Sequence, residues 1–383
     1  MNPVAIFAAC LLWGILTIWV ADWWPWSLFQ LSIFFLAGWR VAHARKLRVT
    51  GAAAALAVAA CWPLAQLAFG QTIQRGATWL ATLNWWTFLI VFLVAADLCA
   101  EARDRRRFLR VMACSGMALA AFSVAQNFGS PAKIFWLFPS GYLEGVMGPF
   151  VNRNQYAAWV ELLLPVALYL AATERRKALY GTAAAILLGS VIACASRAGS
   201  ALAIAEVLAV ALALAARRAA PRRALALWSL QFALFAALAI GVVGWQGLRD
   251  RMLNGSDEVL RVDAVRASVA MVKDRPWTGS GLGTWAEMYP RYAGLDTGVV
   301  VNQAHNDWAQ WAAEGGLPFV ALMMIFAVLL WKPAFRSIYG IGVAAFLLHA
   351  LVDYPMQQRP ALAAWFFAVA GAAYARNSAA QGE

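Results

Sequence analysis

The chain has 383 residues, of which 63% are hydrophobic and 13% charged, with a mean hydropathy of +0.63. Soluble domains are nearer half apolar and a quarter charged, so the composition excludes an ordinary soluble protein and indicates an integral membrane protein. The net charge of +12 would suggest nucleic acid in a soluble protein. In a membrane protein such charges set orientation, and we expect no nucleic-acid partner.

The apolar runs define the expected architecture, because about 20 apolar residues cross a bilayer as one helix. They predict an all-α polytopic membrane protein that forms a single membrane domain over residues 1–383, with a five-helix N-terminal part at 1–128. About twelve spans are expected, at residues 3–20, 24–40, 51–69, 78–97, 108–128, 154–172, 178–195, 198–216, 224–245, 305–331, 337–352 and 360–375.

The connecting loops alternate in charge. If the N-terminus is cytoplasmic, the cytoplasmic loops and tail hold 19 of the 31 Lys and Arg residues. Lys and Arg concentrate in short cytoplasmic loops, so we expect both termini inside the cell. Residues 129–153 and 246–304 would then face the periplasm from the inner membrane.

The longer of these outer segments, 246–304, is large enough to suggest a function. It contains "SDEVLRVDAVRASVAMVKDRPW", in which valines recur at helical spacing until Pro276. This pattern predicts an amphipathic helix of about four turns at the outer membrane face.

Arg197 lies in "ASRAGSALA", where two spans are joined by almost no loop. An arginine at the outer end of such a hairpin lies close to hydrocarbon and needs a partner or a ligand. The alternative is a structural arginine, either salt-bridged or reaching the interface.

Arg261 and Arg266 lie on the expected loop helix. A guanidinium group binds phosphate oxygens in a bidentate manner that lysine cannot match. The alternative is that these are solvated charges on an amphipathic helix.

His305 lies in "NQAHNDWAQWAAEGG", where we expect it in the first turn of a long span. The positive potential of a helix N-terminus favours neutral imidazole, which can accept a proton. The alternative is a histidine that only caps the helix. Asn306 and Asp307 would cap the helix or orient the ring, and Glu314 precedes a Gly-Gly pair that permits close helix packing.

Further polar residues occur within or at the ends of predicted spans. His349 and Asp353 are four residues apart and share a helix face, where they form a structural pair or support the site. Glu161 and Glu206 lie inside spans and need partners, and either could neutralise an arginine. The three histidines show no metal-ligand spacing, so we expect neither a metal nor another cofactor.

Two arginines and one base at the outer leaflet suit a lipid-linked diphosphate substrate. The arginines would hold the diphosphate leaving group while the imidazole deprotonates an acceptor hydroxyl that attacks the sugar carbon. Guanidinium groups can offset the developing charge without a metal. Two other functions remain open. One is a transporter of lipid-linked sugars or anions, although transporters tend to place charges near the midplane. The other is a structural subunit of an envelope complex.

Five segments between Gly148 and Arg376 occur in a family-specific order: "GPFVNRNQYAAWVELLLPVALYL", "ASRAG", "RVDAVRASVAMVKDRPWTGSGLGTW", "AHNDWAQWAAEGGLPF" and "HALVDYPMQQRPA". Together they resemble the O-antigen ligase and O-antigen polymerase-like membrane glycosyltransferases. On this basis residues 129–376 are the ligase-like region.

The resemblance implies a membrane-embedded, inverting GT-C-type fold acting in polysaccharide or lipopolysaccharide biosynthesis. It implies a glycan donor on undecaprenyl or another polyprenyl diphosphate at the outer leaflet, and a glycan, lipid or other hydroxyl acceptor. It assigns the base to His305 and the diphosphate to Arg197 and Arg261. We expect Arg266, five residues after Arg261 on the loop helix, to bind the diphosphate as well. Ligase and polymerase share this chemistry, so the choice between them stays open.

Overall fold

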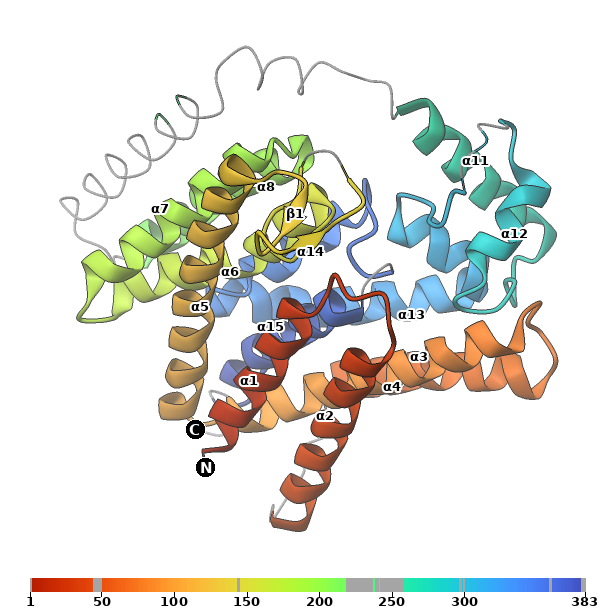
Figure 1. The fold of residues 1–383 in the computed structure, drawn as a ribbon. Coiled ribbons are helices and arrows are strands. Elements are labelled where there is room, and N and C mark those ends of the chain that lie inside the picture. The colour runs from red at the N-terminus through yellow and green to blue at the C-terminus, as the bar shows by residue number, and fades with distance from the viewer. Residues whose placement is uncertain are drawn as a thin grey trace.

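The computed structural model describes residues 2–43, 50–142, 145–217, 258–295, 300–357 and 360–379, and residues 237, 241 and 298. These ranges contain thirteen helices and one two-stranded hairpin (Figure 1). The helices are α1 (Pro3–Leu16), α2 (Trp24–His43), α3 (Gly51–Ala68), α4 (Arg75–Leu98), α5 (Ala102–Gly129), α6 (Arg153–Thr173), α7 (Lys177–Cys194), α8 (Arg197–Ala216), α11 (Glu258–Asp274), α12 (Trp285–Tyr292), α13 (Asp307–Ser337), α14 (Ile341–His349) and α15 (Pro360–Ala379).

Seven of these helices, α3 to α8 and α13, are long and apolar enough to cross a membrane, and α1 and α15 contain shorter apolar helices. This pattern agrees with the expected polytopic membrane protein. The span expected at 337–352 is wrong as a full-length helix, because α14 has only nine residues. At about 1.5 Å per residue it covers roughly half of a 30 Å hydrocarbon core. The span expected at 224–245 lies outside the described residues.

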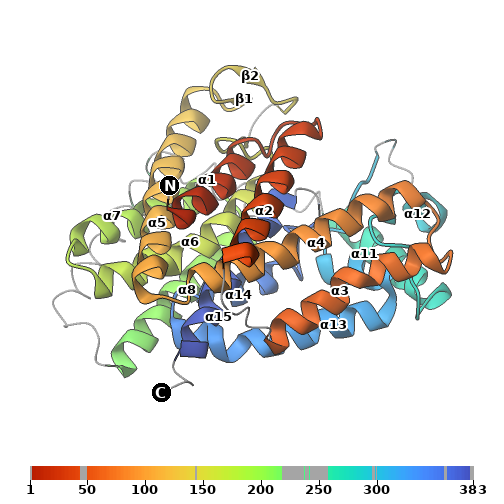
Figure 2. The same cartoon turned by 90° about the horizontal axis from the view of Figure 1, so that it is seen from below.

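Helix α6 is central, since 83% of its apolar stretch is buried compared with 28% for α8. A helix that is apolar on every side is expected at such a position. Helix α15 packs along α4, where a Cβ on Gly371 would lie 2.4 Å from the carbonyl oxygen of Phe92. Helices α3 and α13 run side by side, as Figure 2 shows.

The two outer segments contain small structured elements. Residues 129–153 include a hairpin of β1 (Lys133–Ile134) and β2 (Phe138–Pro139). The expected loop helix is α11, and it packs its small residues against the protein while Val259, Val262 and Val269 stay exposed. Helix α12, which the sequence patterns missed, lies against α11.

A buried carboxylate joins α11 to α12. Asp263 accepts hydrogen bonds from the Tyr289 hydroxyl at 2.7 Å and from the Gly294 amide. Burial and the neighbouring carboxylate raise the pKa of Tyr289 to about 12, so its hydroxyl remains a donor at physiological pH.

Ion pairs mark the end of the bundle that carries most basic loops. Arg40 at the end of α2 pairs with Asp97 of α4 at 2.6 Å, and Arg110 of α5 pairs with Glu174 beyond α6 at 2.7 Å. The N-terminus of α6 therefore lies at the other end of the bundle, the end predicted to be periplasmic.

This orientation predicts the behaviour of a reporter enzyme that folds only outside the cytoplasm. A fusion after Tyr142 should be active, whereas a fusion after Arg175, one helix later, should be inactive because α6 returns the chain to the cytoplasm. Fusion activity and protein abundance should be measured together. The reverse activity pattern at equal abundance would invert the proposed topology.

Candidate functional site

The start of α6 is tied to two distant segments by a pair of asparagines. The Asn152 side chain accepts from the Asn154 amide at 2.8 Å, which caps the helix, and donates to the Tyr354 hydroxyl at 3.1 Å. The Asn154 side chain donates to Asp353 and accepts from Ser196 Oγ at 2.8 Å. The Asn-x-Asn motif thus joins α6, the α7–α8 turn and the 350–357 segment.

Arg197 is the first residue of α8, as the tight hairpin predicted. Ala195 makes the turn with a φ of 53°, and Ser196 caps α8 by accepting from the Gly199 amide at 3.2 Å. Arg197 Nη1 lies 2.8 Å from Glu258 Oε1 at the start of α11, with side chains 41% and 59% exposed. The arginine therefore has an acidic partner, in a pair that remains open to solvent.

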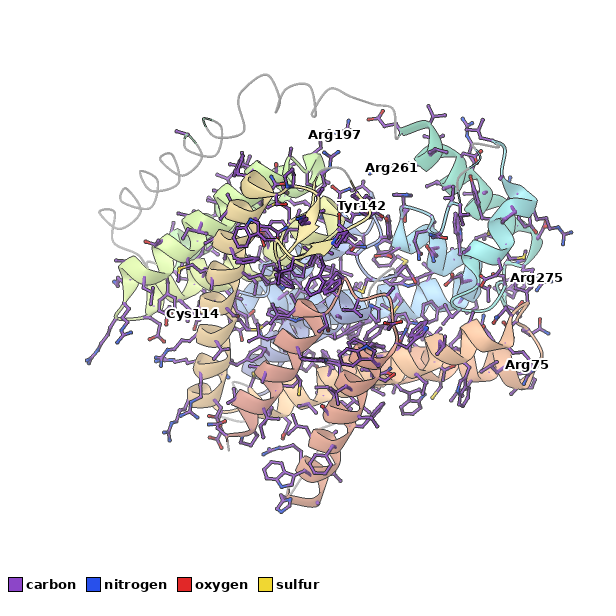
Figure 3. The ribbon with its side chains drawn as sticks, viewed as in Figure 1. Arg75, Cys114, Tyr142, Arg197, Arg261 and Arg275 are labelled. Carbon is purple, nitrogen blue, oxygen red and sulfur yellow. The ribbon has the colours of Figure 1, made fainter. Side chains whose placement is uncertain are left out.

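Arg261 lies one turn further along α11 and points toward the 350–357 segment. Its Nη2 is 4.0 Å from Asp353 Oδ2, and the aspartate side chain is only 3% exposed. Arg261 Nε is buried and hydrogen-bonds to none of the described residues. Figure 3 shows Arg197 and Arg261 over the same part of the bundle, far from Arg275.

Arg266 is placed differently from Arg261. Five residues along a helix correspond to a rotation of roughly 140°, and Arg266 lies on the exposed side of α11 with Val262 and Val269. The structure therefore does not bring Arg266 beside Arg197 and Arg261.

His305 lies immediately before α13, not in its first turn as expected. Asn306 is the cap, so the helix begins at Asp307. The half-buried His305 has a φ of 53°, a left-handed conformation that is uncommon outside glycine. Its ring lies edge-to-face on Tyr354, with centroids 4.6 Å apart. Burial raises the pKa of Tyr354, so a neutral phenol faces the imidazole.

Asn306 and Asp307 fix the chain on either side of this contact. Asn306 Oδ1 accepts from the Ala309 amide at 2.9 Å, and its Nδ2 donates to the Leu351 carbonyl at 2.7 Å. The buried Asp307 carboxylate accepts from the Met356 amide at 2.9 Å. Asn306 therefore caps the helix as predicted, whereas Asp307 positions the 350–357 segment.

His349 does not pair with Asp353 through its side chain. Its Nδ1 lies 2.7 Å from Glu161 Oε1, and both side chains are fully buried. Glu161 therefore has the partner that its position inside a span requires, and that partner is a histidine and not an arginine. Glu206 is buried as well, and its carboxylate hydrogen-bonds to none of the described residues. The His349–Glu161 pair joins α14 to α6 beneath the site.

Glu314 anchors the glycine-rich turn of residues 279–283. Its carboxylate accepts from the amides of Gly283 and Trp285, both at 2.9 Å, and from Gln310 at 3.1 Å. Gly316 interrupts α13 with a φ of 73°, and a Cβ there would lie 2.7 Å from the backbone of Trp277. The Gly-Gly pair therefore permits close packing, but Gly316 packs against the backbone of residues 276–277 and not, as was expected, against another helix.

Sequence reasoning missed Gln66 of α3, which binds the same turn. Its side chain donates to the carbonyls of Thr278 at 2.6 Å and Glu314 at 2.8 Å, and accepts from the Leu282 amide at 3.0 Å. An amide in the apolar run "WPLAQLAFG" was the available signal. Tyr354 and the two asparagines were also missed as site residues, although they lie inside the quoted motifs.

With this geometry in place, comparison with known proteins identifies the central region. Residues 162–324 match the family model described as O-antigen ligase. The resemblance to the O-antigen ligase family is confirmed. The match covers less than half of the chain but includes both arginines and His305, while Asn154 and Asp353 fall outside it. No curated protein matches the chain.

The similarity of residues 162–324 to the O-antigen ligase model supports glycan transfer in surface polysaccharide biosynthesis. The apolar helices agree with a membrane location for that activity.

Proposed function

We propose that this protein transfers a glycan from a polyprenyl diphosphate to an acceptor hydroxyl at the periplasmic face of the inner membrane. Arg197 and Arg261 bind the diphosphate, and His305 acts as the base. Arg266 is a third candidate for binding the diphosphate, but it lies on the exposed side of α11, away from Arg197 and Arg261. Asn306, Asp307, Glu314, His349 and Asp353 position these groups.

One observation carries the proposal: a chain of contacts links the three principal residues. Glu258 on α11 pairs with Arg197 of α8 at 2.8 Å. One turn later on α11, Arg261 Nη2 lies 4.0 Å from Asp353 Oδ2. Tyr354, which follows Asp353, packs on His305 with ring centroids 4.6 Å apart. Segments separated by more than a hundred residues thus meet at one end of the bundle. A transporter would favour charged residues near the midplane of the bilayer, whereas these residues lie at one end of the helix bundle.

The charges of the site suit an exchangeable diphosphate. Exposed ion pairs contribute only about 0–1 kcal/mol, so Arg197 can exchange Glu258 for a phosphate at little cost. Arg261 offers a buried Nε donor in addition to its contact with Asp353. Charge-assisted hydrogen bonds from guanidinium to phosphate are stronger than neutral ones and fix its orientation.

The proposed reaction is a single displacement. The acceptor oxygen gives its proton to the His305 imidazole and forms a bond to the anomeric carbon, while the bond from that carbon to the diphosphate oxygen breaks. Attack from the side opposite the leaving group inverts the anomeric configuration. The polyprenyl diphosphate leaves with the additional negative charge, which the two guanidinium groups stabilise.

The direct test uses purified protein, a polyprenyl-diphosphate oligosaccharide and an acceptor glycan. We expect a glycosylated acceptor of inverted linkage and one equivalent of polyprenyl diphosphate. The rate should be unchanged in excess EDTA, because guanidinium groups supply the charge stabilisation. Loss of activity on chelation, restored by Mg²⁺ or Mn²⁺, would contradict the metal-independent mechanism. Transport of the donor across a vesicle membrane without transfer would contradict the enzyme.

A further inference from the structure

A cavity of about 690 Å³ lies beside the first two turns of α13. The beginning of α4 and Trp23, just before α2, form one wall, and the glycine-rich turn with α12 forms another. Residues 356, 357 and 360 complete it. The proposed base and arginines are not among the residues that line it.

The lining combines aromatic rings with uncharged and acidic polar groups. Trp79 and Trp23 are 52% and 58% exposed, whereas Trp85 and Trp311 are nearly buried and pack against one another with centroids 6.1 Å apart. The polar groups come from four elements: Gln74, Asn84, Glu287, Glu314 and Gln357. Among the described lining residues none is Lys or Arg.

This combination suits a neutral polyhydroxyl ligand better than a phosphate. Indole faces pack on the C–H faces of a sugar ring by dispersion and apolar burial, while carboxylates and amides bind its hydroxyl groups. Gln357 Nε2 is a buried donor that hydrogen-bonds to none of the described residues. The exposed Glu287 carboxylate in the lining disfavours an anion. The cavity is within the size range of small-molecule sites.

We propose that this cavity binds the saccharide that accepts the glycan, an inference that rests on the proposed transfer function. The donor diphosphate and the acceptor sugar then occupy two sites of opposite charge. Cationic Arg197 and Arg261 form the first, and the second contains the exposed Glu287 carboxylate.

The backbone connects this cavity to the proposed base. Tyr354 packs on His305, and two residues later Met356 both lines the cavity and donates to Asp307 at 2.9 Å. On the other side, α13 begins beside His305 and reaches the cavity at Trp311, about one turn into the helix. A sugar held here lies along the same two segments that flank the imidazole.

The test measures saccharide binding separately from turnover. The full chain is purified in an amine-oxide detergent, because a maltoside headgroup would compete. Tryptophan fluorescence is titrated with neutral oligosaccharides released by mild acid from the host envelope, and pyrophosphate is titrated separately. Trp79→Ala and Glu287→Gln are the test variants. Trp24→Ala is the matched control, since Trp24 is 57% exposed and does not line the cavity.

We expect the saccharide Kd to rise on the order of tenfold in each test variant, as loss of one aromatic contact or charged hydrogen bond implies. Pyrophosphate binding should stay unchanged, and Trp24→Ala should behave as wild type. Unchanged saccharide affinity in both test variants would overturn the proposal. So would a response to dodecanol but to no saccharide, which would indicate a lipid-tail site. If saccharide binding weakens as expected while the wild type transfers no glycan, the proposed function fails and the saccharide site stands.

Discussion

His305→Ala is expected to slow glycan transfer roughly 10²–10⁴-fold, the usual contribution of a positioned general base. Donor binding should survive, because the arginines carry it. His305→Gln should be as slow as the alanine variant, since glutamine is polar and similar in length but has no basic nitrogen. Donor affinity and transfer rate should be measured separately on each purified variant.

Two comparisons make this experiment decisive. His43→Ala removes an exposed histidine at the end of α2 and should leave the rate unchanged. The wild-type rate should fall at low pH, because only neutral imidazole accepts a proton. A His305→Gln variant with near wild-type rate would remove the base assignment. Equal losses of donor binding and rate in His305→Ala would make the residue structural.

Arg197→Lys and Arg261→Lys are each expected to lower the transfer rate on the order of 10²–10³-fold, the scale reported for losing one preorganised donor to a developing anion. Lysine keeps the positive charge but loses the planar fork that holds two phosphate oxygens. Both variants should insert and accumulate normally, because lysine keeps a positive charge opposite Glu258 and Asp353.

The control for this pair is Arg275→Lys, just beyond the end of α11 and far from the site (Figure 3). It should retain the wild-type rate. Arg266→Lys should cost much less than Arg261→Lys, since Arg266 lies on the exposed side of the helix. Near-normal rates in both Arg197→Lys and Arg261→Lys would show that charge alone suffices there.

Hydropathy predicted most helices because each needs only a local run of apolar residues. It failed for α14, where a long-range bond decides the boundary. The Asp307 amide donates to the carbonyls of Ala350 and Asp353, which holds a turn where the apolar run alone suggested a helix. No local pattern in residues 337–352 contains that information.

Individual residues of the candidate site could be predicted where the residue type is energetically unfavourable in its local sequence. Arg197 in a tight hairpin and His305 before a long helix were recognisable because each is unusual in its local setting. The side chain with which each of these polar residues pairs could not be predicted from the sequence. His349 joins Glu161, 188 residues earlier in the chain, and not Asp353, four residues later. The choice between these two carboxylates depends on how α14 packs against α6, which no local sequence pattern contains.

The three bonds of Gln66 have a consequence for the order of assembly. Their partners lie 212 to 248 residues later in the chain. At a synthesis rate of roughly 5–20 residues per second, these partners are made on the order of ten seconds or more after Gln66. An unpaired amide in hydrocarbon is costly, but Gln66 is only two residues from the end of α3, where water can satisfy it. The full set of bonds that holds the glycine-rich turn between Gln66 and Glu314 can therefore form only after α13 has been synthesised.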